Sequence, residues 1–158
     1  MTGGIYGSSI TLGGTSSGYL SLGGQHNSVS LGHSGDTIGL GTYATLNDGS
    51  GHQQVTLGNS GSLTSFGNDT INAGDSLSAV LLGGDSLFGG AYATITGSGL
   101  GAVMNDTITL GGNASVTAVM DSSFITLGGT ASGYLSLNGS NNSVSLGCLL
   151  YTSPSPRD

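Results

Sequence analysis

A four-residue phrase (an apolar residue, any residue, Leu, then Gly or Asn) occurs ten times in this chain. The copies begin at Ile10, Leu20, Val29, Ile38, Val55, Val80, Ile108, Ile125, Leu135 and Val144. Their leucines are 10, 9, 9, 17, 25, 28, 17, 10 and 9 residues apart, which fits multiples of about nine residues. A unit this short cannot bury its apolar face alone, so the sequence predicts a stack of strand-and-turn units.

A longer repeat is superimposed on the short one. Ile10 to Gly32 recurs as Ile125 to Gly147, 115 residues later and identical at 19 of 23 positions. The differences exchange only small or polar residues, so every apolar residue is retained. The offset is about thirteen nine-residue units. We therefore expect this chain to be a fragment of a longer tandem array.

Alternating apolar and polar residues predict strands throughout. Within the repeated phrase the two apolar side chains point to one face of a strand, and the residue between them points to the other face. Two nine-residue units facing each other across a thin core make a coil of about 18 residues that rises about 4.8 Å. The predicted fold class is all-β: a parallel β-roll or β-helix solenoid of roughly eight coils with almost no helix.

The last eleven residues differ in composition from the rest of the chain. Residues 1–147 contain no Lys, Arg, Pro, Cys or Trp, and their only charged residues are seven aspartates. The segment 148–158 holds the only Cys, Pro and Arg residues. A nucleotide sequence that encodes this segment resembles a transposase-type sequencing adapter. We predict a repeat domain over 1–147, as a fragment of a longer array, and a non-native adapter-like tail over 148–158.

Charge and composition narrow the classes of function. The formal net charge is −7, and no basic residue precedes Arg157. We expect no nucleic-acid binding, which needs Lys or Arg against the phosphates. We expect no membrane insertion, because no run of apolar residues is long enough. No Glu, Lys, Arg or Trp precedes Cys148, so few side chains suited to catalysis are present. We predict that the chain is not an enzyme, and a polysaccharide-active β-helix is the least favoured alternative.

Several turns resemble the nonapeptide G-G-x-G-x-D-x-U-x, in which U is apolar. The nearest matches are Gly67-Asn-Asp-Thr-Ile71 and Asn105-Asp-Thr-Ile108, while Gly35–Ile38, Gly74–Leu77 and Gly84–Leu87 keep x-D-x-U. Asn27, Gln53 and Asn142 stand where other units have Asp, and no copy keeps the whole pattern. The chain thus resembles a degenerate RTX-type repeat of the kind found in bacterial adhesin solenoids. That resemblance implies a parallel β-roll and Ca²⁺ as a cofactor.

Calcium requires several oxygen ligands, which such rolls take from turns stacked on one edge. Asp69, Asp85 and Asp106 are 16 and 21 residues apart, close to one coil, and Asp36 precedes Asp69 by nearly two coils. The predicted metal ligands are therefore Asp69, Asp85, Asp106 and Asp36, with Asp75 on another edge. The alternative is that these aspartates only cap turns through local hydrogen bonds.

Three other patterns are candidate sites. Eight copies of Ser/Thr-apolar-Ser/Thr predict hydroxyl rows, which resemble the Thr-x-Thr arrays of ice-binding solenoids or simply solvate an uncharged surface. Gly14-Thr-Ser-Ser-Gly18 matches the nucleophile pattern G-x-S-x-G, but Ala131 replaces Ser16 in the long repeat. The three histidines, His26, His33 and His52, predict neither a triad nor a metal site.

The sequence thus predicts a structural role. We expect a rigid stalk or spacer in a secreted or cell-surface bacterial adhesin-like protein, located outside the cell, with adhesin domains flanking this fragment. The alternatives from other classes are an ice-binding solenoid and a self-assembling filament. Because an uncapped solenoid end exposes a strand edge, we also expect end-to-end self-association.

Overall fold

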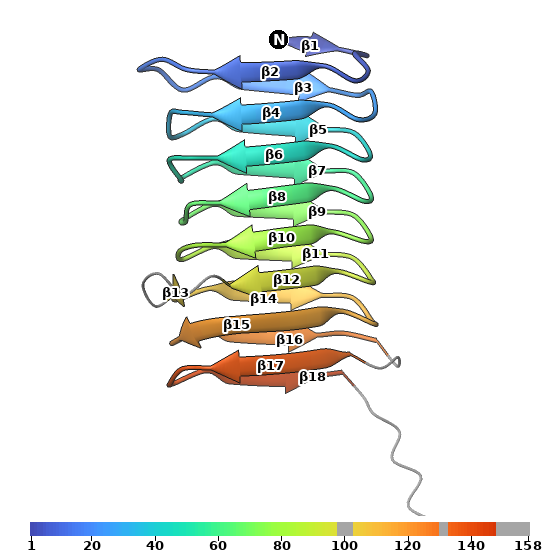
Figure 1. Ribbon diagram of the computed structural model, residues 1–158. Coiled ribbons are helices and arrows are strands. Elements are labelled where there is room, and N and C mark those ends of the chain that lie inside the picture. Colours follow the sequence, from blue (N-terminus) through green and yellow to red (C-terminus); the bar gives the residue numbers. More distant parts are fainter. Residues whose placement is uncertain (98–102, 130–132, 148–158) are drawn as a thin grey trace, which may run out of the picture.

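The computed structural model describes residues 1–97, 103–129 and 133–147, and these residues wind into a β-solenoid (Figure 1). Sheet A contains, in spatial order, β1 (Thr2–Gly3), β3 (Tyr19–Leu22), β5 (Thr37–Leu40), β7 (Gln54–Leu57), β9 (Thr70–Ala73), β11 (Ser86–Gly89), β14 (Thr107–Leu110), β16 (Phe124–Leu127) and β18 (Ser143–Leu146). Sheet B contains β2 (Ser9–Leu12), β4 (Ser28–Leu31), β6 (Thr45–Asp48), β8 (Ser62–Ser65), β10 (Ser78–Leu81), β12 (Thr94–Gly97), β15 (Ser115–Asp121) and β17 (Tyr134–Asn138), and β13 (Val103–Met104) pairs with the end of β15.

The strand register fixes the length of each coil. Ser62 aligns with Ser78, sixteen residues later, and Thr94 aligns with Ser115, 21 residues later. All pairs are parallel, as the sequence predicts, and coil lengths bracket the expected value of about 18 residues. The described residues form no helix, and therefore no helix long and apolar enough to cross a membrane is found among them.

The hydrophobic core is a thin layer between the two sheets. In β14, Ile108 and Leu110 are 0% and 2% exposed, while Thr107 points to solvent. The same alternation recurs in the inner coils, so apolar side chains stack on their counterparts one coil away. Each buried Leu or Ile contributes about 1.5–3 kcal/mol relative to its exposed state. This confirms the inward orientation predicted for the two apolar residues of the repeated phrase.

Both corners of the coil use one type of turn. The second residue before each strand adopts a left-handed conformation at many corners, as in Asn68 before β9 (φ 58°) and Tyr43 before β6 (φ 55°). Some turns also require glycine for space. Gly51 has φ 72°, and a Cβ there would lie 2.1 Å from the carbonyl oxygen of Gly67. Coils that stack this closely at their corners restrict such positions to glycine.

The long repeat places its two copies on opposite sheets. Ile10 lies in β2 of sheet B, whereas its counterpart Ile125 lies in β16 of sheet A. The reason is that thirteen half-coils is an odd number. Asn27 and Asn142 nevertheless make matching contacts, because their Oδ1 atoms accept the N–H groups of Ser8 and Ser123 at 3.1 and 3.0 Å. The half-coil is therefore the structural unit that the sequence repeats.

Candidate functional site: a buried polar ladder

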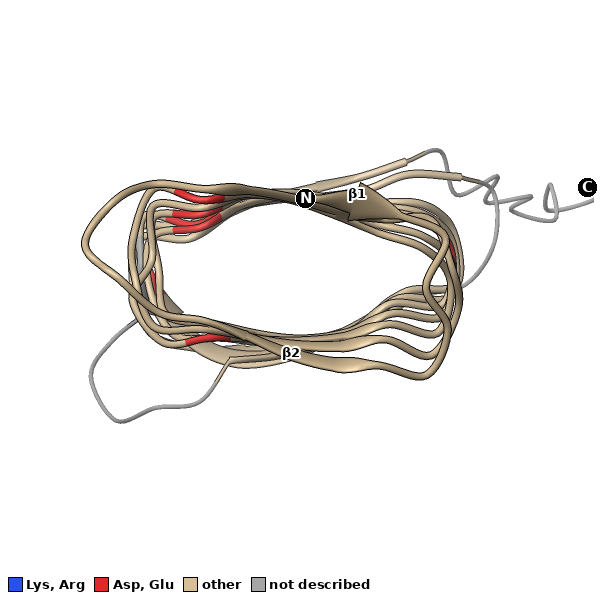
Figure 2. Ribbon diagram, turned by 90° about the horizontal axis from the view of Figure 1, so that it is seen from above, with Lys and Arg blue, Asp and Glu red and all other residues tan. Residues whose placement is uncertain are grey.

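A column of polar side chains runs along the corner where sheet B strands end and sheet A strands begin. We call it the polar ladder, and its rungs are Asp36, Gln53, Asp69, Asp85, Asp106, Ser123 and Asn142. Each rung immediately precedes a strand of sheet A and follows a turn residue. Seen down the axis of the solenoid, acidic residues gather at this corner (Figure 2). The rungs from Asp36 to Ser123 are at most 3% exposed.

Each rung accepts a hydrogen bond from the main chain of the rung before it. The N–H of Asp36 donates to Oε1 of Gln53 at 2.6 Å, and the N–H of Asp69 donates to Oδ1 of Asp85 at 3.0 Å. The N–H of Asp85 in turn donates to Oδ1 of Asp106 at 2.6 Å. A buried N–H without a partner costs free energy comparable to a lost hydrogen bond. The side chains therefore satisfy main-chain donors at the corner, where strand pairing is interrupted.

Amide side chains at this turn position make a second contact. The Nδ2 of Asn142 donates to the carbonyl oxygen of Met120 at 2.7 Å, and the Nε2 of Gln53 donates to that of His33 at 2.6 Å. In both cases the acceptor lies three residues before the preceding rung. On the sheet B side, Asn27 makes the same contact with the carbonyl oxygen of Ile5 at 2.7 Å. An amide thus satisfies one donor and one acceptor of the adjacent coil.

An ionised aspartate cannot make that second contact, because it has no donor. The Oδ2 atoms of Asp36, Asp85 and Asp106 are buried and have no hydrogen-bond partner. Burial raises the pKa of Asp85 to about 6 and that of Asp106 to about 7. Burial also raises the pKa of Asp69 to about 7, against the opposing hydrogen bond from Ser65. A protonated carboxyl group regains the donor that Asn and Gln supply at the equivalent rungs.

The structure brings Asp69, Asp85 and Asp106 together on one edge, as their spacing predicts. Asp36 lies on the same edge, but Gln53 separates it from Asp69. Asp75 lies at the opposite corner between β9 and β10, where its Oδ1 accepts the N–H of Ala91 at 2.8 Å. The expectation of a separate edge for Asp75 is therefore confirmed.

Sequence reasoning missed two members of this corner. Ser123 is a rung, and the signal that could have found it is its place two residues before the inward-facing Ile125. Asp48 ends β6, is 2% exposed, and accepts the N–H of Gly51 and the Nε2 of Gln53 at 2.8 and 3.0 Å. Its charge adds to the effect of burial in raising the pKa of Asp69 and Asp85.

The carboxylates of the ladder form a row and do not surround one common metal position. Among the described residues, no three or more His, Cys, Asp or Glu side chains are grouped so that they could hold one metal ion. Both oxygens of Asp69 are engaged, since Oδ1 accepts the N–H of Gln53 and Oδ2 accepts the hydroxyl of Ser65. The free Oδ2 atoms of Asp85 and Asp106 lie in neighbouring coils. These two carboxylates are the part of the predicted set that fits a cation best.

The other corner carries the same turn with different chemistry. The residues that precede the strands of sheet B include the buried side chains of Ala44, Leu77, Ala93 and Ala114. At this position the sheet B corner carries mainly apolar side chains, with Asn27 before β4 as a polar exception, whereas the sheet A corner is lined by hydrogen-bonding groups. Nothing in the nine-residue period distinguishes the two corners, because alternate half-coils share the same phrase.

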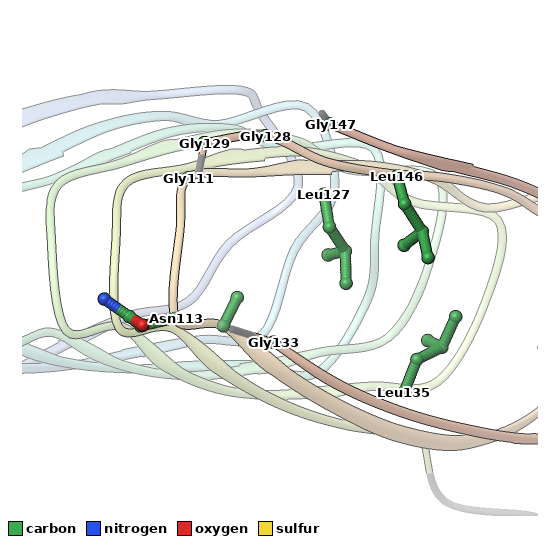
Figure 3. A pocket seen from close by; sticks show the side chains of 10 residues that line it. Gly111, Asn113, Leu127, Gly128, Gly129, Gly133, Leu135, Leu146 and Gly147 are labelled. Atoms are coloured by element: carbon green, nitrogen blue, oxygen red, sulfur yellow. The ribbon is translucent and has the colours of Figure 1, made fainter. Parts of the chain in front are cut away.

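A cavity lies near the C-terminal end of the described coils (Figure 3). Its volume is about 320 Å³, and its walls include Leu127, Leu135, Leu146 and several glycines. No charged side chain lines it. Residues 130–132, which include the Ala131 counterpart of Ser16, lie outside the described residues, as does the adapter-like tail 148–158. This cavity is a continuation of the apolar core rather than a candidate for chemistry.

Comparison with family models, with curated proteins and with solved structures finds no match to this chain.

Proposed function

We propose that this chain is a structural stalk or spacer in an extracellular or cell-surface protein of the bacterial adhesin type. The observation that carries the proposal is the continuous stacking of parallel coils. Each strand forms hydrogen bonds with the next coil, and the polar ladder adds hydrogen bonds between coils at one corner. A solenoid of this kind is quasi-one-dimensional, so its length grows in proportion to its coil number. Such a rod holds attached domains at a fixed distance.

Spin labels can test the rod directly. Cysteines would replace Ser9 together with either Thr94 or Ser136, in a background in which Cys148→Ser removes the one existing thiol. These sites are five and seven coil steps apart on sheet B. At about 4.8 Å per step we expect narrow distance distributions near 24 and 34 Å. Broad distributions that do not scale with coil number would reject a rigid spacer. Antibody labelling of intact producing cells would test the surface location.

Weak calcium binding belongs to the same proposal. The free Oδ2 atoms of Asp85 and Asp106 support it. The turn carbonyl oxygens of Phe66 and Leu82 are candidates for further ligands, because they lie three residues before the preceding rungs, as the Met120 acceptor of Asn142 does. Carboxylate and carbonyl oxygens are the ligands that Ca²⁺ prefers, and water would complete its coordination. When bound, the ion would neutralise buried carboxylates.

Ice binding is a second candidate, and the outward face of sheet B favours it. From β2 to β15 that face presents fourteen aligned positions, of which twelve are Ser or Thr and the other two are Asn47 and Val80. Sheet A carries the exposed rings of Tyr19, Phe88 and Phe124 instead. Five of the eight predicted Ser/Thr-apolar-Ser/Thr copies lie in sheet B strands.

Ice recrystallisation assays would decide this second candidate. If sheet B binds ice, Thr64→Tyr would abolish inhibition, whereas Thr126→Tyr on sheet A would leave it intact. A wild-type chain without inhibitory activity would exclude the candidate.

End-to-end self-association is a further component of the proposal. β18 is the last described strand of sheet A, and Val144 and Leu146 are 41% and 55% exposed there. A second copy could pair with that edge. Sedimentation velocity at increasing concentration would show linear oligomers, and a strictly monomeric chain would contradict this part.

A further inference from the structure

A small cavity lies beside the first rung of the polar ladder. Its volume is about 170 Å³, and it is lined by Leu12, Gly13, Ser16, Gly18, His33 and Asp36. Two of these side chains bring polar atoms that are buried and have no hydrogen-bond partner, namely Nδ1 of His33 and Oδ2 of Asp36. Both atoms belong to side chains that line one cavity, and a bound group that reaches them would satisfy both.

Neighbouring contacts hold both residues in place. Asp36 is 3% exposed, and its Oδ1 accepts the N–H of Gly18 at 2.6 Å, which anchors the carboxylate beside the cavity. The carbonyl oxygen of His33 accepts the Nε2 of Gln53, also at 2.6 Å. Leaving a buried polar atom unsatisfied costs about 1–3 kcal/mol. A ligand that binds both atoms would remove this cost for each of them.

We propose that this cavity binds a divalent transition-metal ion of the zinc class through Nδ1 of His33 and Oδ2 of Asp36. A cation accepts lone pairs from both atoms at once, provided that the imidazole proton resides on Nε2. Imidazole nitrogen suits Zn²⁺, whereas Ca²⁺ takes oxygen ligands. The Ser16 hydroxyl lines the same cavity, and at about 30 Å³ per water there is room for solvent ligands. This site is separate from the Asp85–Asp106 pair and from the spacer role.

Ser16, His33 and Asp36 do not form a catalytic triad in this arrangement. The described structure records no hydrogen bond between any two of these side chains, and Oδ1 of Asp36 is already engaged by Gly18. A triad needs the carboxylate to orient the imidazole, and the imidazole to contact the hydroxyl. The cavity therefore has the residues of a binding site without the geometry of a nucleophile.

Titration calorimetry with ZnCl₂ tests the proposal on the full chain, produced without a histidine tag. Every protein would carry Cys148→Ser, because a thiol also binds zinc. Asp36→Asn keeps the acceptor for Gly18 and removes the charge, and His33→Asn removes the imidazole. His26→Asn and His52→Asn are the matched controls. Cobalt(II) provides a second readout, since its visible spectrum reports nitrogen coordination.

We expect one zinc ion per chain, a raised melting temperature, and a cobalt spectrum that zinc displaces. Loss of an outer partner of a metal ligand already weakens affinity about 10–100-fold, so His33→Asn and Asp36→Asn should each weaken binding at least tenfold. The two control variants should bind as the parent does. Absence of binding, or equal binding by all variants, would overturn the proposal and leave water as the occupant of the cavity.

Discussion

The main-chain N–H of Asp85 donates to Oδ1 of Asp106 in the next coil at 2.6 Å, while Oδ2 of Asp106 is buried without a partner. One oxygen of each such carboxylate is thus structural and the other is available. At the equivalent rung of the last described coil, Asn142 fills the second place with an N–H₂ group. A proton or a cation can fill it at Asp85 and Asp106.

The first prediction concerns pH. Burial raises the pKa of Asp69, Asp85 and Asp106 to about 7, 6 and 7, from an ordinary value of 3.8. Raised pKa values give stability that is fully present below about pH 4 and is lost as pH rises through 6 to 7. We expect the free energy of unfolding to be lower at pH 8 than at pH 5 by about 2 kcal/mol or more. Chemical denaturation across this range, in chelator, measures it. A stability that increases toward pH 8 would contradict the raised pKa values of the ladder aspartates.

The second prediction concerns Asp85→Asn. Asn keeps the acceptor for the Asp69 N–H and adds an N–H₂ donor of the kind that Asn142 uses to bind the carbonyl oxygen of Met120. We expect greater stability at pH 8 by about 1–2 kcal/mol and little change at pH 4, because the wild-type carboxyl is neutral there. Thermal unfolding at the two pH values provides the measurement.

Asp75→Asn is the matched control for this variant. Asp75 also accepts a main-chain N–H from the next coil, but it is exposed. Its replacement should therefore change stability by less than about 0.5 kcal/mol at either pH. Equal responses from the two variants would mean that burial of the ladder does not govern the effect.

Calcium provides the third prediction. We expect binding at about 10⁻⁴ to 10⁻³ M, with a stabilisation of about 2.7 kcal/mol at a hundredfold excess over the dissociation constant. Asp85→Asn should abolish most of this gain, and low pH should weaken it because protons compete for the same oxygens. Calorimetric melting with calcium and with chelator measures the shift. An unchanged melting temperature would mean that the aspartates serve only as hydrogen-bond acceptors.

The fourth prediction compares neighbours in β14. Leu110 is 2% exposed and faces the core, so Leu110→Ala should cost about 2–5 kcal/mol. Thr109 points outward on the same strand, and Thr109→Ala should cost well under about 1 kcal/mol. Denaturant midpoints of both variants give the comparison. Similar losses at the two positions would be inconsistent with the inward register.

The repeated phrase predicted much of the fold because strand periodicity and burial are local properties. Alternation in segments such as Ile108-Thr-Leu110 fixes which side chains face inward. The leucine intervals likewise predicted stacked units and a coil of about 18 residues. The spacing of Asp69, Asp85 and Asp106 was enough to place them on one edge, because register converts sequence distance into spatial distance.

Other features depended on three-dimensional placement. The sequence did not indicate that Ile10 and Ile125 belong to opposite sheets, nor that one corner carries a continuous column of buried polar side chains, because successive half-coils carry the same phrase. The cavity beside His33 and Asp36 was equally hidden, since its other wall belongs to the end of β2 and the neighbouring turn between β2 and β3, namely Leu12, Gly13, Ser16 and Gly18. By itself the sequence determined the repeating unit and its inward face. Only the tertiary structure decided which sheet each copy of the long repeat joins and which side chains of neighbouring turns enclose a cavity, because these contacts follow from the summed lengths of all the turns before them.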